Sequence, residues 1–154
     1  MTAHRQLEFA DEQAGAVDAI AGIASGKGWC NLTPEIDSTD VEVLSVSVFS
    51  LRTKRGSPVA TLVTSPPRRG TPRAGTLGVL HTRGRLGAAR IDPLLNGAAF
   101  PLRQDHTQRG LLFEVPADAE PATVLRVMTS LLVGLCDYRL TGNWRLDVFE
   151  RATT

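Results

Sequence analysis

The sequence predicts an α+β domain in which an N-terminal helix and an apolar C-terminal helix pack on an antiparallel sheet of about five or six strands. Two segments place apolar residues at intervals of three and four, as helices do. Several shorter segments alternate apolar with polar residues, as half-buried strands do. The length of 154 residues fits one domain, residues 1–154. We expect residues 1–9 and 151–154 to fray, because chain ends make few contacts.

The first helix is predicted between Asp11 and Ala24. Apolar residues recur there at helical spacing, two acids favour the start, and Ser25–Gly28 favours the end. The following segment, from Trp29 to Asp40, contains Pro34 and several acids, so we expect a surface loop.

Two hairpins are predicted next. Glu42–Leu51 alternates apolar and polar residues, and a turn-forming segment separates it from a second strand, Pro58–Thr64. Thr76–Thr82 and Arg85–Ile91 are separated by Arg83 and Gly84, and two-residue loops with glycine favour tight hairpins. These four segments predict an antiparallel meander.

Two connections accompany the meander. Ser65–Gly75 contains prolines and glycines that exclude a central strand, so we expect an exposed loop carrying three arginines. Asp92–Gly110 has little periodicity, and we expect a long loop with one short helical turn at Leu94–Ala98. Leu111–Val115 is short and apolar, as in a buried strand, and Pro116 ends it.

The clearest helix follows Pro121, which suits a first helical position. Its small and polar residues recur at steps of three or four, and the remaining faces are more apolar than one face of a small sheet requires. We therefore expect this helix either to be sandwiched within the domain or to support a homodimer through residues 121–138. A turn at Thr141–Asn143 leads to a last strand, Trp144–Glu150.

The charge is unevenly distributed along the chain. Residues 43–110 contain eleven basic residues and two acidic ones, a net charge of +9, whereas the whole chain has a formal net charge of +1. Residues 1–42 hold eight acids and two bases. Such a division steers partners of opposite charge, and it often accompanies binding to nucleic acids or other anions.

These observations predict a non-enzymatic binding or adaptor module that engages an acidic protein partner through arginine-bearing loops. The arginines could instead pair with the acidic N-terminal segment, and each pair would then contribute only about 0–1 kcal/mol. The predicted partner-binding residues are Arg55, Arg68, Arg69, Arg73, Arg83 and Arg85.

A first alternative is binding of a nucleic acid or a phosphate ligand through the basic segment 43–110, since arginines contact phosphates well. The segment lacks a recognition motif, however. Gly70–Thr76 has the glycine spacing of a nucleotide-binding loop without its lysine, and only two aromatic residues occur in the segment to stack on bases.

A second alternative is a small-molecule enzyme that uses the loop of Asp105 and His106, where an acid and a base could converge. His81 is expected to be a histidine at the edge of the core. We expect no metal site and no cofactor, and Cys30 and Cys136 are predicted to be small buried apolar residues.

The expected location is the cytoplasm of a bacterium. The N-terminal residues lack the apolar core of a secretory signal, and the longest apolar stretch, Val124–Cys136, is interrupted and too short to span a bilayer. All but two of the seventeen basic residues are arginines, as is typical of a GC-rich coding sequence.

Overall fold

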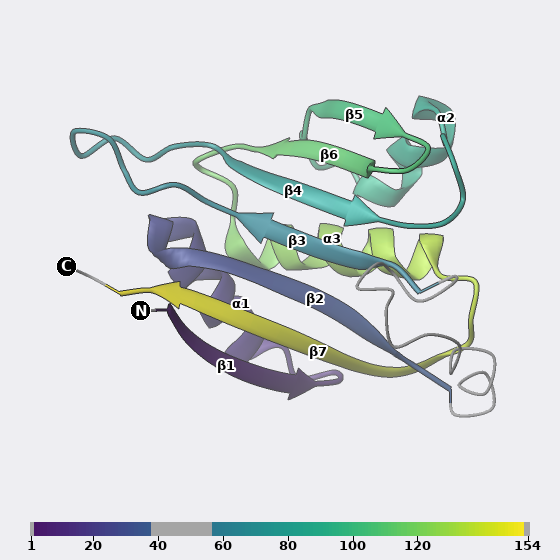
Figure 1. Ribbon diagram of the computed structural model, residues 1–154, viewed down its shortest axis with the longest axis horizontal. Helices are drawn as coiled ribbons and strands as arrows, with labels where there is room; N and C mark the ends of the chain where they lie inside the picture. The colour runs from purple at the N-terminus through teal and green to yellow at the C-terminus, as the bar shows by residue number, and fades with distance from the viewer. Residues whose placement is uncertain (1, 38–56, 153–154) are drawn as a thin grey trace.

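The computed structural model describes residues 2–37 and 57–152, which form one antiparallel sheet covered on one face by helices (Figure 1). The α+β class is confirmed, but the sheet has seven strands rather than five or six, in the order β1-β7-β2-β3-β4-β6-β5. The strands are β1 (Thr2–Phe9), β2 (Gly28–Ile36), β3 (Val59–Val63), β4 (Gly75–Leu80), β5 (Leu102–His106), β6 (Gly110–Val115) and β7 (Leu140–Arg151). The helices are α1 (Ala14–Gly22), α2 (Ala88–Ile91) and α3 (Pro121–Leu135); π-helical and 3₁₀ turns, Ile23–Lys27 and Asp92–Leu95, follow α1 and α2.

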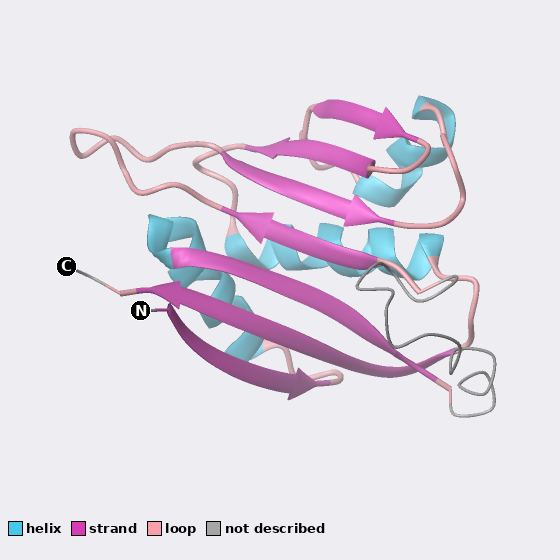
Figure 2. Ribbon diagram, in the orientation of Figure 1, coloured by secondary structure: helices cyan, strands magenta, loops and turns pink. Residues whose placement is uncertain are grey.

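The core lies between the sheet and the helices (Figure 2). Strand alternation sends every second residue into it, as Cys30 and Leu32 of β2 and Leu146 and Val148 of β7 illustrate. The intervening residues lie on the opposite face of the sheet, which no described helix covers. We call this opposite face the open face.

Helix α3 packs against α1 and the central strands β2 and β3. Its close approach to the turn after α2 depends on Gly134, where a methyl group would meet the Leu94 side chain at 2.5 Å. Val133 is 55% exposed. Most of the apolar surface of α3 is nevertheless buried within the domain. The buried residues are Val124, Leu125, Val127, Met128, Leu131, Leu132 and Leu135.

Three strands, β1, β2 and β5, occupy segments for which the sequence predicts none. Residues 2–9 form β1, which pairs with β7 over its whole length, and Leu7 and Phe9 pack against the core. Trp29 to Ile36 is a central strand rather than a loop. Pro34 is tolerated because it lies beyond the stretch of β2 that pairs with β3, next to a register shift in the pairing with β7.

The second predicted hairpin is wrong. Arg85–Ile91 is not a strand, because α2 occupies its second half and β4 pairs with β3 and β6 instead. Leu86, which precedes α2, and Ile91, within it, are both buried in the core, whereas residues five positions apart would lie on opposite faces of a strand.

The predicted long loop at residues 92–110 also contains regular structure, since β5 pairs with β6 at the edge of the sheet. Its predicted helical turn is found slightly earlier, at Asp92–Leu95. The last strand begins at Leu140, before the predicted turn. The predicted strand Glu42–Leu51 lies outside the described residues.

Candidate partner-binding surfaces

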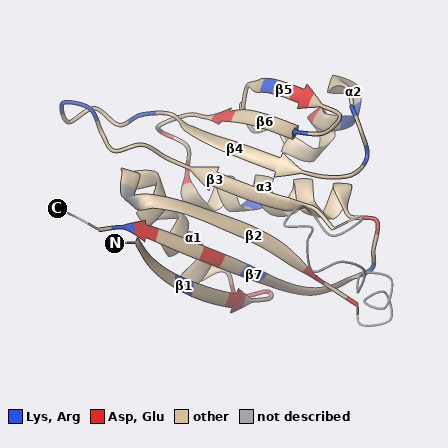
Figure 3. Cartoon of the chain, in the orientation of Figure 1, with Lys and Arg blue, Asp and Glu red and all other residues tan. Residues whose placement is uncertain are grey.

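Three of the predicted arginines lie on the loop that joins β3 to β4, which projects from one end of the sheet (Figure 3). Arg68, Arg69 and Arg73 are all exposed. Arg68 and Thr71 exchange backbone hydrogen bonds of 3.0 Å each, and Arg69 and Gly70 between them have positive φ angles of 53° and 77°. These bonds close a tight turn at the tip, so the first two guanidinium groups extend from a defined piece of backbone.

The base of this loop is tied to the domain. The Thr64 hydroxyl donates a hydrogen bond to the Ile23 carbonyl oxygen, and the Thr64 side chain is buried. At Gly26 a methyl group would meet the backbone of Pro66 at 2.5 Å, so the start of the loop lies against the turn that follows α1. The loop therefore projects from a fixed base.

The loop arginines form no ion pair with the described part of the chain. Elsewhere in that part, Arg5 pairs with Glu150, Arg83 with Asp137, Arg103 with Glu114 and Arg145 with Asp147. No acid of β1 or α1 forms an ion pair with these three arginines. Pairing with the acidic N-terminal segment, the alternative that would make these arginines ordinary surface ions, does not occur among the described residues.

Of the other predicted arginines, the two that the structure describes, Arg83 and Arg85, do not join this loop. Arg83 and Arg85 follow the opposite end of β4 (Figure 3). Arg83 lies 2.8 Å from Asp137 and donates to the carbonyl oxygen of Cys136, so its charge is already compensated. Arg55 lies outside the described residues. The six predicted residues thus do not form one site.

Asp105 binds the chain's own backbone. Its carboxylate accepts hydrogen bonds from the N–H groups of Leu86 (3.1 and 3.2 Å) and Gly87 (2.8 Å), which holds the start of α2 against the edge strand β5. Burial tends to raise the pKa of Asp105, but these two N–H groups, with the charge of Arg85, outweigh it and leave the pKa below its ordinary value. An anionic acceptor suits this structural role.

His106 does not converge with Asp105. Its Nδ1 accepts the backbone N–H groups of Gln108 (3.0 Å) and Arg109 (3.2 Å), which closes the hairpin between β5 and β6. The two residues are neighbours on a strand, where successive side chains point to opposite faces. The acid–base pair considered for an enzyme is therefore not assembled here.

His81 is a buried histidine at the end of β4. Its Nδ1 accepts the backbone N–H of Arg83 at 3.1 Å, which assigns the proton of the neutral ring to Nε2. Nε2 is buried without a partner among the described residues. Burial lowers the pKa of His81, helped by the charges of Arg83 and Arg90 and opposed by Asp105 and Asp137.

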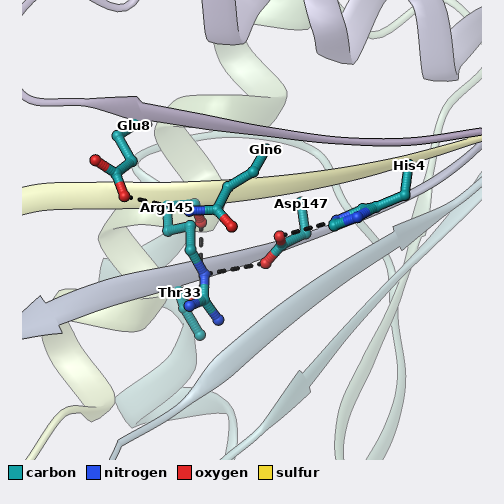
Figure 4. A network of polar contacts seen from close by, with 6 residues as sticks. All are labelled: His4, Gln6, Glu8, Thr33, Arg145 and Asp147. Carbon is teal, nitrogen blue, oxygen red and sulfur yellow. Dashed lines mark hydrogen bonds and ion pairs between the residues drawn. The ribbon is translucent and has the colours of Figure 1, made fainter.

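The open face carries a polar network where β1, β7 and β2 lie side by side (Figure 4). Asp147 accepts from His4 Nε2 (3.1 Å) and from Arg145 Nε (3.1 Å). Gln6 donates to Glu8 at 3.2 Å. The polar groups in this part of the open face are largely hydrogen-bonded to one another, and no local sequence pattern predicts them because the residues come from both ends of the chain.

Three rings stack beside this network. Phe149 lies between His4 and Trp29, with centroid distances of 4.7 and 5.2 Å. Because Phe149 has a ring on each side, its faces are not available to stack on a nucleic-acid base. The large apolar residues exposed on the described strands, Val63, Leu80 and Leu102, are each about 40% exposed and lie on three different strands.

An open cavity of about 370 Å³ lies between the end of β1 and the start of α1. Leu7, Phe9 and Ala16 form its apolar wall, and acids at positions 8, 11 and 12 lie along it. Neither Asp105 nor His106 lines it.

Other kinds of site find little support in the described part of the chain. It contains no group of three or more His, Cys, Asp or Glu residues that could hold a metal ion. Among its helices, none is long and apolar enough to cross a membrane. Comparisons with protein-family models, curated proteins and solved structures give no match, so the functional argument depends on the surfaces described above.

Proposed function

We propose that this protein is a non-enzymatic binding module that engages an acidic protein partner through Arg68, Arg69 and Arg73. The observation that supports it best is that three exposed arginines without ion pairs in the described structure share one projecting loop with a fixed base. Arginine forks bind carboxylates in a bidentate manner, and a closed turn reduces the entropy lost when they do.

A protein partner fits this distribution of charge better than a nucleic acid does. Tight binding to a phosphate backbone requires many cationic contacts along one track. Here the arginines that the structure describes on either side of β4 lie at two ends of the sheet, and the open face between them carries acids such as Glu114 and Asp147. A short acidic segment needs only the three arginines of one loop.

Self-association through residues 121–138 stays a prediction. This prediction depends on excess apolar surface on α3, but most large side chains of α3 are buried inside the domain. Val133 is the exposed exception among its large apolar residues.

The test compares two triple variants of equal charge. The first changes Arg68, Arg69 and Arg73 to Ser, and the second, its control, changes Arg85, Arg90 and Arg109 to Ser at the opposite end of the sheet. The probe is a fluorescent oligoglutamate peptide, titrated by anisotropy. The loop variant should weaken binding about tenfold, as three exposed contacts of about 0.5 kcal/mol each predict, and the control should bind as the parent does.

Equal loss in both variants would contradict a site on the loop. The same titration with single-stranded DNA tests the nucleic-acid alternative. Tighter binding to DNA than to the peptide, with an affinity that falls steeply with salt and depends on both arginine sets, would replace the proposed function.

A further inference from the structure

We propose that the free edge of β1 pairs with the β1 edge of a second copy of this chain, antiparallel and centred on Gln6, so that two sheets join into one. This contact uses neither the arginine loop nor α3, and it is independent of the proposed function.

The edge is suited to strand pairing. β1 pairs with β7 on one side, and no described strand lies on its other side. It is eight residues long without a register shift, whereas five to six residues is the usual strand length. Its first five residues are exposed, and it contains neither proline nor a bulge, two features that commonly block edge pairing. Its outward N–H and C=O groups therefore form a ready template.

Identity of the two strands restricts the geometry. On an edge strand, the N–H and C=O groups of every second residue point outward. In a two-fold pair of identical strands, an even-numbered residue must therefore lie opposite an even-numbered residue, and an odd-numbered residue opposite an odd-numbered one. Paired residues then lie on the same face of the joined sheet. The two open faces become continuous, and both helical layers lie on the other side of the joined sheet.

Charge favours the register centred on Gln6 over the neighbouring one centred on Arg5. Centred on Gln6, the pairing sets His4 opposite Glu8 of the second copy, twice by symmetry, and sets the two Gln6 amides side by side. Centred on Arg5, it would set two guanidinium groups against each other, and like charges directly opposite are destabilising. Glu8 already lies opposite Arg145 and His4 already contacts Asp147, so the Gln6 register joins the two polar networks into one.

Cysteine cross-linking tests the register directly. In a Cys136→Ser background, Gln6→Cys places two thiols across the two-fold axis at a Cα distance of about 4.5–5.5 Å, within the range of a disulfide. The remaining native thiol, Cys30, is buried, which raises its pKa to about 12 and keeps it unreactive. Mild oxidation should give a covalent dimer, and Gln104→Cys on the β5 edge should not.

Mixed samples sharpen this result. His4→Cys and Glu8→Cys should each cross-link poorly alone and efficiently when mixed, because only the mixture sets one opposite the other. If His4→Cys alone cross-links as efficiently as Gln6→Cys alone, the proposed register is wrong. Absence of any excess over Gln104→Cys would overturn the interface.

Sedimentation of the unmodified protein provides the second measurement. The weight-average mass should rise from monomer towards dimer with concentration. Glu8→Lys, which sets Lys against His4, should shift the protein to monomer, while the control Glu12→Lys beyond the strand should not. A monomer throughout, or a dimer that Glu8→Lys leaves intact, would refute pairing through β1.

Discussion

The two edges of the sheet differ in what their polar side chains do. At the β5 edge, Asp105 holds the N–H groups before α2 and His106 closes the hairpin, so these side chains satisfy the chain's own backbone. β5 is also shorter than β1, with five residues against eight, and has a register shift in its pairing with β6. At the β1 edge, His4, Gln6 and Glu8 interact with other side chains and leave a long, regular backbone edge without a partner in the described structure.

This difference shows why residue type alone misassigns function. Asp105 and His106 resemble an acid–base pair in the sequence, yet both are engaged with backbone groups that would otherwise lack partners. The residues of β1 look like an unremarkable polar terminus, yet they border the more accessible of the two edges. A polar side chain is available to a partner only when no backbone group of the chain itself requires it as a hydrogen-bond partner.

The largest loss of stability near the β5 edge is expected from Gly110→Ala, at the start of β6. Gly110 has a φ of 75°, and a methyl group there would overlap the Val79 backbone carbonyl across the β4–β6 pair. We expect a loss of about 2–4 kcal/mol in the free energy of unfolding, measured by urea denaturation. Gly87→Ala is the control, because its φ of 82° is similar but its surroundings are open. An equal loss in both variants would show that backbone strain, and not the overlap, is responsible.

Asp105→Ala should give the next largest effect. It leaves the N–H groups of Leu86 and Gly87 without their anionic acceptor, and we expect a loss of about 1–3 kcal/mol at pH 7. Because the folded state lowers the pKa of Asp105, its contribution is fully present above the ordinary carboxyl value of 3.8 and is lost as the pH falls through the lower, folded value. The difference between wild type and variant should therefore shrink in acid. A difference that is constant with pH would assign the loss to packing.

The same contrast explains how far the sequence predicts the fold. Periodicity predicts α3, β4 and β6, because each has a strong local pattern that the tertiary structure keeps. It fails at β2, where Pro34 and nearby acids suggest a loop although the strand is central, and at β1, where Leu7 and Phe9 give only a brief alternation. Strand order brings the two chain ends together, and no local pattern encodes that.

The candidate site was predictable only in part for a related reason. The count of +9 over residues 43–110 identifies a basic segment, but β4 separates the arginines of the Ser65–Gly75 loop from Arg83 and Arg85, which follow its other end. The proline-rich composition of Ser65–Gly75 does predict an exposed loop, and its three arginines are exposed there. That Arg83 would meet Asp137 instead of a partner depends on a contact between residues 54 positions apart.

His81 should give a smaller, pH-dependent effect near the β5 edge. Its folded pKa is below the ordinary 6.5, so the unfolded chain binds the proton more readily. Stability from this residue is complete above pH 6.5 and decreases as the pH falls from there towards the folded pKa. His81→Asn retains an acceptor near the Nδ1 position and removes the titration, so its unfolding free energy should decrease less over this range. Parallel curves for wild type and variant would contradict this assignment.

The smallest effects should come from exposed ion pairs, and they should be alike at the two edges. Arg103 contacts Glu114 at 2.6 Å beside β5, and Arg5 contacts Glu150 at 3.5 Å beside β1; all four side chains are between 42% and 57% exposed. Solvent screens both pairs, so Arg103→Ala and Arg5→Ala should each change the unfolding free energy by about 0–1 kcal/mol, and less in high salt. If Arg103→Ala alone destabilises the domain by more, then the β5 edge depends on its surface charges as well as on the backbone contacts of Asp105 and His106. The two edges would then differ in how much all their side-chain contacts contribute to stability, and not only in whether side chains bind the backbone.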